Sequence, residues 1–309
     1  MGKYIVRRLL TVIPTLLGIV LIVFVIMSIT PGSPAKALLG NNAQPEAIEA
    51  LNRELGYYDP LPVRFWNYLV DILKGDLGIS YRTRQDILPD LMARIPYTLL
   101  IGTLSMIFAA LIGISIGILS AVKQYSVADT LSTSLAILAS SVPAFWLAML
   151  LMLLFTLRWK LLPSIGTDTW KHFVLPILTL SLATSSGLLR LTRTTMLETI
   201  RQDYIRTARA KGNPESIVIW KHALRNACIP IITNLGMRFG GVLGGTIVIE
   251  SVFGIPGVGY YMLTSINYKD TPAVVSTTLF ISAFFCVIMV LVDILYALVD
   301  PRIRERFAK

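Results

Sequence analysis

The sequence predicts an all-α membrane protein with six transmembrane helices. Its 309 residues are 54% hydrophobic and only 15% charged, whereas a soluble domain typically has about 25% charged residues. The hydrophobic residues also lie in long runs, and a helix needs about 20 mostly apolar residues to cross a bilayer. Six runs have or approach that length, at residues 9–30, 97–122, 131–157, 173–189, 226–249 and 273–299.

The first run fits either a signal peptide or an uncleaved span. Lys3, Arg7 and Arg8 precede it, and the Ala-Lys-Ala at 35–37 offers a small-residue cleavage site. The apolar core is longer than the roughly 7–15 residues of a signal peptide. We therefore expect residues 1–30 to form the N-terminal end and an uncleaved first span.

Residues 31–96 form a hydrophilic loop whose charges are nearly balanced. A short helix is predicted at 44–55, with Pro45 near its start and Gly56 after its end. A second, amphipathic helix is predicted at 64–73, and it carries aromatic residues typical of a membrane interface, namely Phe65, Trp66 and Tyr68. Two interpretations stay open: a cap over the outer mouth of a path, or an ordered loop without function.

The distribution of Lys and Arg predicts the orientation. Six spans place both termini on one side, and cytoplasmic segments are enriched in Lys and Arg. The segments on the side of the termini are 1–8, 123–130, 190–225 and the tail 300–309. Together these segments are shorter than the segments on the other side, yet they carry more Lys and Arg. We therefore expect both termini in the cytoplasm, and the net charge of +10 follows from this bias.

A basic hairpin is predicted at residues 198–227, inside a membrane core that extends over 97–299. Residues 198–211 contain good helix formers, and Gly212 stands where a helix C-cap is expected. Asn213 is expected to N-cap a second helix with Pro214 at its first position. In that second helix one apolar stripe is predicted to face the spans, formed by Ile217, Trp220 and Leu224.

The first helix of the hairpin presents two predicted faces. One carries Tyr204, Ala208 and Lys211, and the other carries Arg206 and Arg209. Small residues flanked by cations and an aromatic ring suit a groove in a partner protein. Two alternatives are a solvated loop that only sets the topology and a surface for anionic lipid headgroups. Nucleic-acid binding has no other support in the chain.

The hairpin resembles the coupling loop of permeases in the ATP-binding-cassette (ABC) importers. "YIRTARAKG" followed by "HALRN" and "IP" is similar to the basic variant of this loop in the peptide and nickel subfamily. The general signature has Glu-Ala-Ala where this chain has Arg206-Thr207-Ala208, so only Ala208 and Gly212 match it. Further landmarks resemble the subfamily in order and spacing, and they are "PGSP" at 31–34, "GDLGIS" at 75–80, "RIPYTL" at 94–99, "VIESVFGIPGVG" at 248–259 and "DPRIR" at 300–304.

The resemblance implies a type I importer permease fold in a prokaryotic plasma membrane. It also implies a second homologous permease, two ATP-binding subunits and an external substrate-binding protein as partners. The coupling residues that it implies are Tyr204, Ile205, Arg206, Thr207, Ala208, Arg209, Ala210, Lys211 and Gly212. The cargo would be a di- or oligopeptide moved by alternating access, with nickel or another metal chelate as the alternative.

The chain shows no chemistry of its own. It has no G-x-x-x-x-G-K-[ST] loop, so ATP and Mg²⁺ are expected only on the partner ATPases. His172 and His222 lack neighbouring ligands at metal spacing, and no catalytic nucleophile is predicted. A standalone ion-coupled transporter would predict inverted repeats and acidic residues at mid-depth, which this sequence does not show.

Charged and small residues within the spans suggest a path. Arg238 and Asp293 lie inside predicted spans, where charges face cavities or partners, and both are candidates to line the path. We expect Arg238 to contact a peptide carboxylate or backbone carbonyl there. The alternatives are a direct Arg238–Asp293 pair and a pair of Asp293 with Arg190 or Arg193. Helix packing is predicted for the glycines of the fifth span, which are Gly236, Gly240, Gly241, Gly244 and Gly245, and more weakly for Gly113 and Gly117. An outer turn, either a gate or an ordinary loop, is expected at Glu250, Gly254, Pro256, Gly257 and Gly259.

Overall fold

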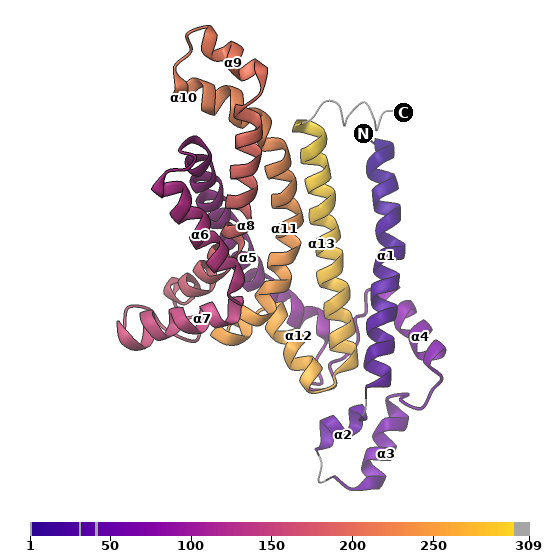
Figure 1. Cartoon of the computed structure of the whole chain (residues 1–309). Coiled ribbons are helices and arrows are strands. Elements are labelled where there is room, and N and C mark those ends of the chain that lie inside the picture. Colours follow the sequence, from indigo (N-terminus) through magenta and orange to yellow (C-terminus); the bar gives the residue numbers. More distant parts are fainter. Residues whose placement is uncertain (1, 31, 41–42, 300–309) are drawn as a thin grey trace. The chain divides into compact units, whose positions relative to one another are not determined.

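The computed structural model describes residues 2–30, 32–40 and 43–299, and this part of the chain is helical almost throughout (Figure 1). Within it, the only β-type pairing is an isolated bridge between Ile79 and Asp86. Five helices are long and apolar enough to cross a membrane, or six if one bent pair is a single span. The predicted all-α membrane class is confirmed. The predicted tail 300–309 lies outside the described residues.

The chain forms two compact units, which we describe separately. The first is built around residues 99–255, and the second around residues 2–98 and 256–290. The long helix α5 (Ile87–Val122) begins in the second unit and ends in the first.

The span predicted at 131–157 is bent in the structure. Its residues form α6 (Val127–Ser141), then α7 (Ala144–Met152) and the π-helical η1 (Leu153–Arg158), and the two parts meet at an angle of 102°. Pro143 causes the break, because a proline disfavours helical dihedrals in the residue before it. Val142 accordingly has φ −91° and ψ 125°.

Helix α8 (Val174–Ile200) is the centre of the first unit, and it is preceded by the short η2 (Trp170–Phe173). It extends well beyond the predicted 173–189, and Thr192, Met196 and Thr199 in the added part are buried. Glycines on α5 let the two helices approach closely. A Cβ added to Gly113 would lie 2.8 Å from the Ser185 carbonyl oxygen, and one added to Gly117 would lie 2.8 Å from that of Leu189.

The second unit contains the expected loop helices and two more. The structure has α3 (Pro45–Glu54) and α4 (Leu61–Leu73) at the predicted sites, while α2 (Pro34–Leu39) and α12 (Val258–Asn267) were not predicted. The aromatic face of α4 packs on α1 (Gly2–Ile29), since the ring of Phe24 lies 5.4 Å from that of Phe65 and 5.9 Å from that of Tyr68.

The long helix α13 (Thr271–Val299) begins at a buried carboxylate, Asp270. Its oxygens accept hydrogen bonds from the Ser80 hydroxyl at 2.5 Å, from the backbone N–H groups of Tyr81 and Arg82 at 3.1 and 3.2 Å, and from that of Ala273 at 3.3 Å. The same carboxylate therefore caps the helix and holds the loop that follows α4.

Substituting Gly113 with Ala is expected to destabilise the purified subunit by about 1–3 kcal/mol. The added methyl group would meet the backbone of α8, which cannot move aside as a flexible side chain could. The measurement is the free energy of unfolding in detergent. Gly18→Ala on α1 is the matched control, because a Cβ there has nothing within 4 Å. Equal stabilities of the two variants would contradict this account of α5–α8 packing.

Candidate functional site

The basic hairpin projects from the ends of α8 and α11 (Leu224–Phe253), as Figure 1 shows. The predicted continuous helix 198–211 is wrong, because α8 stops at Ile200 and a separate helix, α9 (Asp203–Ala210), follows. Gln202 separates them with extended dihedrals, φ −72° and ψ 149°. This break lets α9 leave the direction of α8.

The turn of the hairpin differs from the prediction at two residues, Asn213 and Pro214. Gly212 has φ +77°, a conformation that glycine adopts without steric cost, as expected. Asn213 caps the end of α9 and not the start of the next helix, because its Nδ2 donates to the Ala208 carbonyl oxygen at 2.9 Å. Pro214 takes the N-cap position of α10 (Glu215–Ile217).

The second arm of the hairpin is the beginning of the fifth span. Helix α10 continues through the π-helical η3 (Val218–Ala223) directly into α11. The predicted apolar stripe is wrong at two of its three residues, since Ile217 and Trp220 are 40% and 60% exposed. Its third residue, Leu224, packs against the core as predicted. The π-helical turn changes the register, so that Val218, Ile219 and Ala223 are buried instead.

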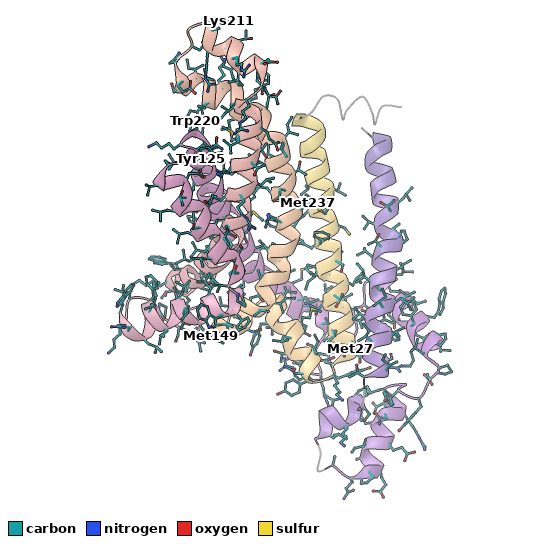
Figure 2. All side chains as sticks on the ribbon, in the orientation of Figure 1. Met27, Tyr125, Met149, Lys211, Trp220 and Met237 are labelled. Atoms are coloured by element: carbon teal, nitrogen blue, oxygen red, sulfur yellow. The ribbon has the colours of Figure 1, made fainter. Side chains whose placement is uncertain are left out.

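The hairpin is joined to the spans by a shared hydrophobic core. Ile205 of α9 is fully buried and Ala208 nearly so. The predicted face of Tyr204, Ala208 and Lys211 is therefore divided, because Ala208 points inward while Lys211 stands at the tip (Figure 2). The remaining members of this core come from α5, α8, η3 and α11, and they are Ile118, Ala121, Met196, Val218, Ile219, Ala223, Ala227 and Ile231.

The basic residues of α9 fall into two kinds. Arg209 is held inside the hairpin, because its Nη2 and Nε donate to the Glu215 carboxylate at 2.7 and 3.1 Å. This contact raises the pKa of Arg209 above its usual value. The Arg206 side chain is 78% exposed and makes only a 3.8 Å contact with Asp203. Arg206 and Lys211 therefore present their charges outward.

An ion pair that the sequence did not indicate lies near the hairpin. Asp129, at the start of α6, is buried and accepts from Nε and Nη2 of Arg193 at 2.7 and 2.9 Å. The Ser120 hydroxyl and the Tyr125 backbone N–H donate to the same carboxylate at 2.5 and 2.9 Å. The cluster ties α5 and α6 to α8. The only available signal was one acidic residue in a short segment between two spans.

Arg238 lies midway along α11, in the first unit. Its Nε donates to the Asn234 Oδ1 at 2.5 Å, and its guanidinium rests against Gly187 on α8. Arg193, a predicted alternative partner of Asp293, is engaged by Asp129 instead. The side chain of Asp293 lies outside the described residues, so the predicted Arg238–Asp293 pair stays a prediction.

The glycines of α11 have different surroundings. Gly236 is buried, and a Cβ on Gly245 would lie 3.3 Å from the Leu180 side chain. Gly240 is half-buried. Gly241 and Gly244 face open space, with nothing within 4 Å of an added Cβ. This face of α11 is uncovered in the single chain.

The expected outer turn joins α11 to α12. Gly254 ends α11 in the left-handed region with φ +61°, and its N–H donates to the carbonyl oxygen of Glu250, a fully buried residue. Pro256 follows, Gly257 is the N-cap of α12, and Gly259 is buried in its first turn. The structure thus has a capped helix end and a second helix at the predicted turn.

Comparisons with known proteins cover nearly the whole chain. Residues 113–305 match the family described as binding-protein-dependent transport system inner membrane component, and residues 1–102 match the N-terminal region of such components. The glutathione transport system permease protein GsiC of Pectobacterium atrosepticum is 42% identical over 306 residues, which are 99% of this chain and 100% of that protein. GsiC of Escherichia coli K12 is 39% identical over the same shares.

The fold also has solved counterparts. An inward-facing structure of the MetNI methionine ABC transporter matches with a TM-score of 0.57 at 20% identity, covering 68% of this chain and 96% of that one. An amino acid ABC transporter matches with a TM-score of 0.53 at 17% identity, covering 70% and 94%. The predicted importer permease fold is thereby confirmed.

Asp129→Ala is expected to lower the free energy of unfolding by about 3–5 kcal/mol, because it leaves Arg193 without a partner in a largely buried place. Glu49→Ala is the matched control, since the Arg53–Glu49 pair is well exposed and should contribute at most about 1 kcal/mol. Denaturant unfolding of the purified subunit measures both. A loss at Asp129 no larger than that at Glu49 would contradict the structural role of the pair.

Proposed function

Because the chain belongs to the family of inner-membrane permease components of binding-protein-dependent ABC transporters, we propose that it imports peptides, with energy supplied by separate ATPase subunits. The proposed class of cargo is supported by the match, over 99% of the chain, to relatives named as glutathione permeases. Glutathione is a γ-linked tripeptide. The cargo is therefore a short peptide or a peptide-like molecule, delivered by an external binding protein.

The hairpin is the proposed contact with the ATPases. Helix α9 projects from the spans, and the charges of Arg206 and Lys211 point away from the core. A helix of this kind fits a groove in a partner. ATP and Mg²⁺ bind to the partner subunits in this proposal, and a second homologous permease completes the path beside the uncovered face of Gly241 and Gly244.

The shared core supports a mechanism for coupling. Ile205 and Ala208 of α9 pack with residues of α5, α8 and α11, and close-packed interiors transmit displacement. Motion of the ATPases thus reaches the spans through Tyr204–Gly212 and switches the path between inward-facing and outward-facing states. In this orientation the hairpin and both chain termini are cytoplasmic, as the basic residues predict.

The cargo proposal is tested by ATP-dependent uptake into proteoliposomes that contain the complete transporter and its binding protein. Radiolabelled glutathione and short peptides should accumulate, and a nickel–histidine chelate should not. Omission of ATP is the control. Uptake of the chelate without uptake of any peptide would reject the peptide cargo.

The coupling proposal is tested by reversing exposed charges on the hairpin. Arg206→Glu with Lys211→Glu should reduce both ATPase binding and uptake by about tenfold or more, because the exposed positive charges meet the partner. Arg53→Glu, an equally exposed site on α3, is the matched control. Co-purification of the ATPases and uptake are measured together.

Exchanging the charges of Arg209 and Glu215 distinguishes an effect on ATPase binding from an effect on folding. Arg209→Glu with Glu215→Arg preserves the internal pair and should leave the amount of folded permease unchanged. Arg209→Glu alone places two carboxylates together and should lower it. If reversal of Arg206 and Lys211 leaves assembly and uptake intact, α9 is not the coupling helix.

A further inference from the structure

Two arginines lie on the neighbouring helices α8 and α11 of the first unit. Arg238 is at the midpoint of α11, beside Met237, which Figure 2 labels about halfway along that helix. Arg190 is on α8. A charge at this depth costs roughly 2.5–3.5 kcal/mol on insertion scales, and such residues face a cavity or a partner. Their position therefore calls for a polar counterpart.

The missing side chain of Gly187 makes room for the Arg238 guanidinium on α8. An added Cβ on Gly187 would lie 2.3 Å from Nη2 and 2.6 Å from Cζ of Arg238, so the guanidinium lies directly against the backbone of α8. Asn234 holds Nε. With Nε engaged, the group presents its remaining N–H donors in a fixed plane, which is the geometry that binds a carboxylate in a bidentate manner.

Arg190 adds a second positive charge to the same place. It follows Gly187 by three residues and so lies on the same side of α8. It is exposed in the single chain. Because Arg238 rests on Gly187, one helical turn from Arg190, the two positive charges lie close enough to repel each other. Among the described side chains, no carboxylate makes an ion pair with either arginine. Two like charges held together are stabilised by an anion between them.

We propose that Arg238 and Arg190 form a carboxylate-binding site on the translocation path, and that the cargo is recognised there by its negative charge. The site rests on the proposed function, because the anion is taken to be the transported peptide. It assigns Arg238 as the positioned bidentate donor, Arg190 as the second cation, and Gly187 as the residue whose missing side chain makes room.

The test compares trialanine with trialanine amide, which lacks the terminal carboxylate, in proteoliposomes that hold the complete transporter and its binding protein. Arg238→Gln and Arg190→Gln should each reduce uptake of the acid relative to the amide by about tenfold or more, the usual size of a lost charged hydrogen bond. Arg238→Lys should retain part of the preference, because it keeps the charge and loses the planar donor pair.

Gly187→Ala provides a variant that leaves both arginines in place. Its methyl group displaces only the flexible end of Arg238, so the assembled complex should form normally while the preference for the acid falls. Gly18→Ala on α1, where an added Cβ has nothing within 4 Å, is the control and should keep the preference. The amount of assembled complex is measured for every variant.

Each outcome has one meaning. A parallel loss of acid and amide uptake in the arginine variants would show a structural role and overturn the site. If Asp293→Asn changed the acid-to-amide uptake ratio as Arg238→Gln does, Arg238 would be assigned to an ion pair with Asp293. That result would also overturn the carboxylate-binding site. Equal uptake of acid and amide by the wild type would reject the site alone. Uptake of neither form, together with no uptake of glutathione, would reject the proposed function and the site with it.

Discussion

The packing of α9 into the ends of three spans is the constraint on which the first unit depends. Ile205 is completely buried, and its neighbours come from α5, α8 and α11. A surface loop could move freely, whereas a helix whose apolar face forms part of the core can move only with the helices around it. The exposed side of α9 stays polar, so a single short helix combines a fixed inner face with an outer face available for binding.

Three charged side chains described above, those of Asp129, Asp270 and Arg238, differ in their surroundings. Asp129 and Asp270 are surrounded by donors that satisfy their oxygens, and each ties together segments that are distant in sequence. Their burial is compatible with a structural role, because a buried charge is tolerated when it is paired and hydrogen-bonded. Arg238 is different, since its described contacts are an amide oxygen and a glycine backbone. The two aspartates therefore stabilise the fold, whereas the Arg238 guanidinium has N–H groups that can donate to a ligand.

Apolar run length located the spans, because the bilayer imposes that length on any helix. It could not locate the break at Val142, since a hydrophobic run has the same composition whether it is straight or bent, although Pro143 was visible. The turn at Gly212 followed from local chemistry, whereas the role of Asn213 depended on which helix end came within reach of its amide. The Asp129–Arg193 pair joins residues 64 positions apart, and a single sequence carries no signal for such a contact.

The π-helical turn Val218–Ala223 has a consequence for comparing this chain with its relatives. Such a turn contains one residue more than an α-helical turn would need over the same rise. A relative that lacked one residue here would continue as a plain α-helix with its span in the same place. An alignment gap of one residue at this point would then mark a change of helix type and not a change of loop length. Equivalent residues before and after the gap would differ by one in their sequence offset between the two proteins.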